Sequence, residues 1–185
     1  MKKIFLFIAF AVIISCKSQT YPLRTYGIDY PKDSYVKDIN NELQSYEGMW
    51  KGSWNNKTFF ISFKKIKYYK SFLDSRSYYA DILVGKFKIL DNNGNIIFDN
   101  TSSIDDKSKI KGSDFRKKDN KYSLSYLDME LCGRNGYVTI QFTDATKTKL
   151  EWKFSEGDVM IDSGCFYHDQ TWPETLPKNV ILTKQ

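Results

Sequence analysis

Hydrophobic and polar residues alternate with a period of two along most of the chain after Gly48. Such alternation is typical of strands that bury one face, and Asn and Gly residues at the intervening positions are typical of tight turns. The segments with this pattern are 50–54, 59–68, 79–90, 96–98, 122–131, 138–142, 150–154, 159–161 and 180–182. They predict an all-β domain, an antiparallel up-and-down barrel of about eight to nine strands, with a β-sandwich as the alternative.

Three segments depart from this alternation. Ser34 as an N-cap, followed by Val36, Ile39 and Leu43 at near-helical spacing, predicts a short N-terminal helix that ends at Gly48 and covers one end of the domain. Residues 99–121 are rich in Asp, Lys and Ser and predict a long loop. The apolar face shifts by one residue within 122–131, which predicts a β-bulge.

The N-terminus has the composition of a bacterial secretion signal. Lys2 and Lys3 precede an apolar run from Ile4 to Ile14, which is too short to span a bilayer, and Ser15-Cys16 follows. The run and this junction resemble a lipobox, in which the peptide is cut before the Cys and the Cys is acylated. We therefore predict a signal peptide over residues 1–15, a lipid anchor on Cys16, a tether over 16–33 and the β-barrel domain over 34–185.

The residue after Cys16 bears on location. It is Lys17 rather than Asp, and by resemblance to lipoprotein sorting in Gram-negative bacteria this favours the outer membrane. No acidic cluster follows, which favours the periplasmic face. Several acyl chains would make the anchor stable, because one chain binds a membrane only marginally.

Charge excludes one class of partner. Removing residues 1–15 leaves 26 basic and 22 acidic residues, a mild net charge of +4. The basic residues are dispersed among acidic ones, whereas nucleic-acid binding needs a clustered basic face. We expect no nucleic-acid partner.

Two cysteines remain besides Cys16. Cys132 and Cys165 lie 33 residues apart in a chain predicted to be exported, where a disulfide is the default. The alternatives are a metal site and a reactive thiol. A metal site needs further ligands in suitable spacing, but the chain has a single His and no CxxC motif.

The sequence shows no clear catalytic constellation. His168 adjoins Asp169, but no nucleophile elbow accompanies it. The acidic pairs Asp128/Glu130 and Glu156/Asp158 have the i, i+2 spacing of one strand face, which an exposed charged face also explains. A Gly-rich phosphate loop and a zinc signature are both missing from the sequence. We expect a non-enzymatic protein without cofactor or metal.

Aromatic residues provide the best indication of function. Eight of them are expected to point largely into the barrel: Trp50, Trp54, Phe59, Phe63, Phe87, Phe142, Trp152 and Phe154. In a small barrel they fill the interior, and in a wider one they line an apolar ligand pocket.

Two resemblances add expectations. Gly48-Met49-Trp50 on the first strand resembles the Gly-x-Trp signature of lipocalins, which are eight-stranded barrels holding a small apolar ligand. Lipocalins also carry Thr-Asp-Tyr before a late strand and an Arg near the last strand that stacks on the Trp. This chain has Thr143-Asp144-Ala145 and, near its end, Lys178 and Lys184.

The chain also resembles an uncharacterised family of small Bacteroidota lipoproteins over most of its length. The segments that carry this likeness are 15–19, 38–43, 48–54 and 179–184. The resemblance implies no activity.

Together these observations predict a lipoprotein that binds a small apolar or amphipathic ligand within a lipocalin-like barrel. The alternatives are an envelope scaffold that binds a protein or glycan through its outer face and the 99–121 loop, and an enzyme acting on envelope substrates through His168.

Overall fold

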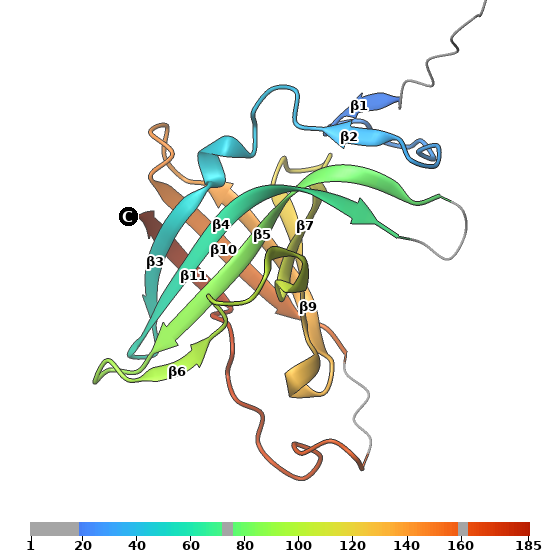
Figure 1. Cartoon of the computed structure of the whole chain (residues 1–185). Helices are drawn as coiled ribbons and strands as arrows, with labels where there is room; N and C mark the ends of the chain where they lie inside the picture. The colour runs from blue at the N-terminus through green and yellow to red at the C-terminus, as the bar shows by residue number, and fades with distance from the viewer. Residues whose placement is uncertain (1–18, 72–75, 159–162) are drawn as a thin grey trace, which may run out of the picture.

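Eight antiparallel strands form a closed barrel in the computed structural model, which describes residues 19–71, 76–158 and 163–185 (Figure 1). The barrel strands are β3 (Gly48–Trp54), β4 (Lys57–Lys70), β5 (Tyr78–Leu90), β7 (Ile110–Phe115), β8 (Tyr122–Asp128), β9 (Arg134–Phe142), β10 (Lys149–Glu156) and β11 (Asn179–Lys184). Each pairs with the next, which confirms the predicted up-and-down barrel. The strand predicted over 159–161 lies outside the described residues.

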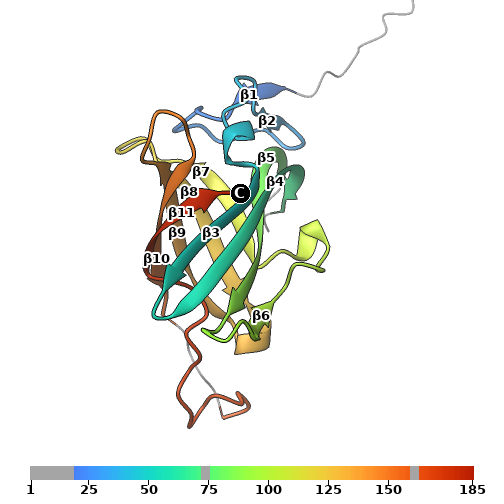
Figure 2. The ribbon, with the colours of Figure 1, turned by 90° about the vertical axis from the view of Figure 1, so that its left-hand side faces the viewer.

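The barrel closes through two short pairings. β11 lies beside β3, with Thr183 opposite Lys51 and Lys184 opposite Trp50 (Figure 2). β5 meets β7 only at Val84 and Gly85. By contrast, β4 and β5 pair along thirteen positions, so the β4–β5 hairpin is the longest continuous part of the wall.

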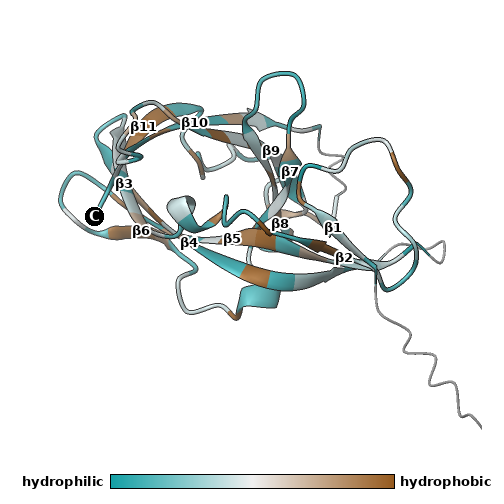
Figure 3. Cartoon of the chain, turned by 90° about the horizontal axis from the view of Figure 1, so that it is seen from above, coloured by the Kyte–Doolittle hydropathy of each residue, from teal (hydrophilic) through white to brown (hydrophobic). Residues whose placement is uncertain are grey.

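The barrel interior is the main hydrophobic core. Inward and outward residues alternate along the strands, and apolar and polar bands alternate in Figure 3. Trp50, Phe59, Ile140 and Trp152 have no exposed surface. Burial of large apolar side chains is the dominant favourable contribution to folding, so this cluster is the principal source of stability.

A second, smaller core lies outside the barrel. β1 (Thr20–Pro22) and β2 (Tyr35–Lys37) are parallel to each other, and β2 is parallel to the start of β5. They cover the outward residues Ala80, Ile82 and Val84 of β5. β5 is therefore buried on both faces, which explains its continuous apolar run. The prediction of a tether over 16–33 does not account for β1 and its contacts with the outer core.

The predicted short helix over 34–47 is replaced by β2, a loop and one 3-10 turn, η1 (Gln44–Tyr46). Val36 packs in the outer core and Leu43 in the barrel core, so the two residues do not share a helix face. The Asp38 carboxylate accepts hydrogen bonds from the amides of Glu42 (2.7 Å) and Leu43 (3.0 Å) and holds the loop between them. No helix in the described ranges is long and apolar enough to cross a membrane.

Residues 99–121 contain a barrel strand that the sequence pattern did not predict. After β6 (Ile96–Asp99) and the turn η2 (Asp105–Lys107), β7 pairs with β5 and β8. The segment is rich in Asp, Lys and Ser, and an irregularity between Gly112 and Phe115 interrupts the alternation of β7, so its sequence has the pattern of a loop.

The bulge predicted within 122–131 is also wrong. β8 pairs with β9 in regular register up to Asp128, and the single turn η3 (Met129–Leu131) follows. Leu127 and Met129 are exposed, so the apparent shift of the apolar face comes from apolar residues on the surface.

The predicted disulfide is confirmed. Cys132 and Cys165 are bonded with their Cα atoms 5.8 Å apart. The bond joins the residue after η3 to the segment 163–178, which leads to β11.

Replacing both cysteines with serine should lower the free energy of unfolding by about 3–4 kcal/mol, because a bond that closes a loop of this length restricts the unfolded chain. Urea denaturation followed by tryptophan fluorescence measures this. The reduced wild-type protein should show the same midpoint as the double variant. Identical midpoints for the oxidised, reduced and variant proteins would contradict the assignment.

Candidate functional site

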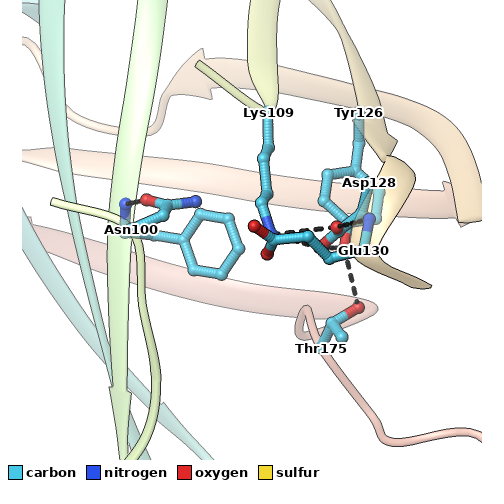
Figure 4. A network of polar contacts seen from close by, with 7 residues as sticks. Asn100, Lys109, Tyr126, Asp128, Glu130 and Thr175 are labelled. Atoms are coloured by element: carbon cyan, nitrogen blue, oxygen red, sulfur yellow. Dashed lines mark hydrogen bonds and ion pairs between the residues drawn. The ribbon is translucent and has the colours of Figure 1, made fainter. Parts of the chain in front are cut away.

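The lower end of the barrel, where β6 and η3 lie in Figure 1, is closed by a polar network (Figure 4). The buried Asp128 carboxylate accepts hydrogen bonds from Lys109 Nζ (2.9 Å) and the Glu130 amide (3.1 Å). The Tyr126 hydroxyl lies 3.1 Å from Asp128 Oδ2 and 3.3 Å from Thr175 Oγ1. Burial alone would lower the pKa of Lys109, but its contacts with Glu130 and Asp128 raise it. The carboxylates of Asp128 and Glu130 therefore offset the cost of burying the Lys109 ammonium.

The segment 163–178 crosses the same end. The Arg134 guanidinium pairs with Glu156 (2.6 Å) and donates a hydrogen bond to the Pro173 carbonyl. Thr175 is buried and meets Tyr126. Together with the disulfide, these contacts hold the segment across the barrel end.

Asn100 lies at the edge of this network in Figure 4. Its Oδ1 accepts a hydrogen bond from the Phe87 amide (2.6 Å), between the part of β5 that pairs with β7 and the part that pairs with β6. Its Nδ2 is buried and has no partner in the described part of the chain. Asn100 therefore completes the hydrogen bonding of the β5 edge.

The eight aromatic residues predicted to line a pocket all belong to the barrel cluster. Six form the buried core, and Trp54 and Phe142 pack against it. The Phe59 ring centroid lies 5.2 Å from that of Trp152 and 6.0 Å from that of Phe87. The sequence left two alternatives, an interior filled by these rings and an apolar pocket lined by them. The contacts between the rings favour the filled interior.

β1, β2 and the C-terminus lie at the upper end of the barrel (Figure 1), and Trp50 is buried beside the last strand there. Its indole N–H donates to the Tyr46 carbonyl of η1 (2.8 Å). Lys184 from the last strand places Nζ 5.3 Å from the Trp50 ring centroid and donates to the Ser45 carbonyl (2.9 Å). Lys184 is thus the cation of the last strand that contacts Trp50.

A cleft of about 290 Å³ opens beside this end. We call it the rim cleft. Its walls include Leu23, Ile28, Tyr30, Lys70, Tyr78, Asp114 and Phe115.

β2 and β7 pair with different segments of the same edge of β5, and the cleft lies between these two segments. β2 pairs up to Ala80 and β7 pairs from Val84. Between them the Leu83 amide donates to the Tyr122 hydroxyl (3.3 Å), a substitute for a strand partner.

The rim cleft combines aromatic walls with three ionisable side chains, those of Lys70, Asp81 and Asp114. Lys70 Nζ donates to the Ser113 carbonyl (3.1 Å), and burial lowers the pKa of Lys70 against the opposing effect of Asp114. Burial also raises the pKa of Tyr30 and of Tyr78. Perturbed groups in a cleft of mixed polarity are typical of binding sites.

None of the residues predicted from the sequence to line a ligand pocket belongs to the rim cleft. The sequence does contain one indication of the cleft, a local concentration of tyrosine. Eight of the thirteen tyrosines lie in two short ranges, 21–35 and 68–79.

The candidate catalytic pair is on the surface. His168 Nδ1 lies 2.9 Å from Asp169 Oδ1, and their side chains are 44% and 90% exposed. Within the described ranges, no group of three or more His, Cys, Asp or Glu residues could hold a metal ion.

The chain belongs to a family of unknown function, DUF6705, whose model matches residues 1–185. No curated protein and no solved structure matches the chain.

The variant Asp128→Asn should lower the free energy of unfolding by about 3 kcal/mol, because it removes one partner of a buried ion pair. Glu130→Gln is the matched control. The Glu130 side chain also contacts Lys109 but is 83% exposed, so its loss should cost less than about 1 kcal/mol. Equal losses in chemical denaturation would contradict a structural role for the buried pair.

Proposed function

We propose that this DUF6705 protein is a non-catalytic lipoprotein of the outer membrane that binds a small amphipathic molecule in the rim cleft. The signal peptide and the lipid on Cys16 come from the sequence pattern and lie outside the described residues. On this proposal the membrane is reached through the lipid, and the barrel is a rigid support for the cleft.

The composition of the rim cleft carries the proposal. Leu23, Ile28 and Phe115 offer apolar surface, while Lys70 and Asp114 offer one charge of each sign. Such a lining suits a molecule with an apolar body and a polar group. The volume of about 290 Å³ admits part of such a molecule.

The proposed place differs from the barrel interior expected from the lipocalin resemblance. Trp152, Phe59 and Phe87 pack against one another inside the barrel, and Trp152 also donates a hydrogen bond to the Pro177 carbonyl (2.8 Å). A ligand there would have to displace these contacts, whereas the rim cleft is open to solvent.

A matched pair of serine variants tests the proposal. Ser113 lines the rim cleft, and Ser125 lies on the outer face of the adjacent strand β8; both are exposed. The variant Ser113→Trp should fill the cleft and weaken binding of a fluorescent lysophospholipid at least tenfold. Ser125→Trp should bind as the wild type does.

Fluorescence titration below the critical micelle concentration measures these affinities. Equal binding by both variants, or no saturable binding by the wild type, would overturn the proposal.

A second candidate function is a scaffold that binds another envelope protein. The observation that favours it is an exposed apolar group near the lower end, with Leu127, Met129 and Tyr137 exposed by 51%, 74% and 71%. Exposed apolar patches commonly mark interaction sites.

A photo-crosslinking residue at position 137 should then capture one defined partner in cells, and the same residue at the polar position 153 should not. Identical crosslinking patterns at both positions would remove this candidate.

A further inference from the structure

Only a short stretch of sequence separates the predicted lipid anchor from the part of the chain that the structure describes. The Gln19 carbonyl accepts a hydrogen bond from the Tyr35 amide (2.8 Å), so the chain is attached to β2 from Gln19 onward. Three residues of extended chain reach at most about 10–11 Å. A lipid on Cys16 therefore holds Gln19 within about 10–11 Å of the residue that carries the acyl chains.

The rim cleft begins at this attachment. β1 starts at Thr20, and Leu23, Ile28 and Tyr30 are part of one wall of the cleft. An anchor on Cys16 thus brings the upper end of the barrel, with the cleft, toward the bilayer. η3 and the segment 163–178 lie at the opposite, lower end of the barrel (Figure 1).

The upper end also has the composition of a membrane interface. The eight tyrosines of the ranges 21–35 and 68–79 gather over β1, β2 and the adjoining end of the β4–β5 hairpin. Tyr69 and Ile28 are 40% and 44% exposed. Lys67 Nζ lies 4.4 Å from the ring centroids of both Tyr35 and Tyr79. Amphipathic aromatic rings and lysines are characteristic of the headgroup region of a bilayer.

The charges of the cleft indicate the kind of headgroup. The cleft contains Lys70, Asp81 and Asp114. Both oxygens of Asp81 are occupied, by the Tyr35 hydroxyl (2.5 Å) and the Asp38 amide (2.9 Å). One ammonium and one carboxylate, those of Lys70 and Asp114, therefore face a ligand.

We infer that the upper end of the barrel faces the bilayer and that the rim cleft takes the zwitterionic headgroup of a phospholipid. The phosphate pairs with Lys70 and the ammonium with Asp114, beside the faces of Tyr30 and Tyr78. Aromatic faces attract such cations. This inference rests on the proposed function, because it names the ligand of the same cleft.

The orientation is tested with the lipidated protein in phosphatidylethanolamine vesicles that contain brominated lipid. A fluorophore on Ile28→Cys should be quenched, and one on Met129→Cys at the opposite end should not. Equal quenching at both positions, or quenching at 129 alone, would overturn the orientation.

Competition tests the headgroup. Lysophosphatidylethanolamine should displace the fluorescent lysophospholipid from the purified lipidated protein at least tenfold more effectively than lysophosphatidylglycerol with the same acyl chain. Asp114→Asn should abolish this preference, whereas the control Asp106→Asn, at an exposed aspartate outside the cleft, should retain it.

The outcomes separate the two proposals. Equal competition by both lipids, with Ser113→Trp still blocking the probe, would overturn the headgroup and leave the binding cleft. Failure of the probe to bind the wild type would overturn both. Displacement by free phosphoethanolamine at the same concentration as the lipid would show that membrane lipid is not the required source.

Discussion

The hydrogen-bonding edge of β5 is the constraint on which the rest of the structure depends. This strand has thirteen residues, and its backbone groups on the side away from β4 meet three different short strands. Buried amides need partners, and at the junctions between these strands side chains supply them: the Tyr122 hydroxyl for Leu83 and the Asn100 amide oxygen for Phe87. Because these two side chains satisfy the amides at the junctions, β7 can close the barrel although it pairs with only part of the β5 edge.

The two junctions along the β5 edge differ in whether other segments cover them. At the lower one, β6, the Lys109–Asp128 pair and the disulfide-linked segment 163–178 cover the barrel end. At the upper one, β2 and β7 diverge, and the rim cleft remains between them, walled by the N-terminal segment and the β4–β5 hairpin. The interior, filled by aromatic rings, stabilises the barrel, and the cleft proposed to bind a ligand lies at its rim.

Much of the fold could be predicted from alternation alone, since β3, β4, β5, β9 and β10 bury one face or both along regular pleats. β7 could not, because the irregularity between Gly112 and Phe115 breaks the period. The expected helix failed because Val36 and Leu43 are buried in separate cores. The disulfide could be predicted from the two cysteines that remain besides Cys16 in a chain predicted to be exported. The rim cleft depends on where β2 and β7 register on β5, a tertiary feature without a local pattern, and the tyrosine concentration was its only trace in the sequence.

We propose that the ligand binds at the rim of the barrel rather than inside it. Amide chemical shifts of the protein, followed by NMR during titration with a lysophospholipid, test this most directly. We predict saturable shifts at Tyr30, Tyr78 and Phe115, with the strands around Phe59 and Trp152 unchanged. Shifts centred on Phe59 and Trp152 would place the ligand within the barrel and contradict the account.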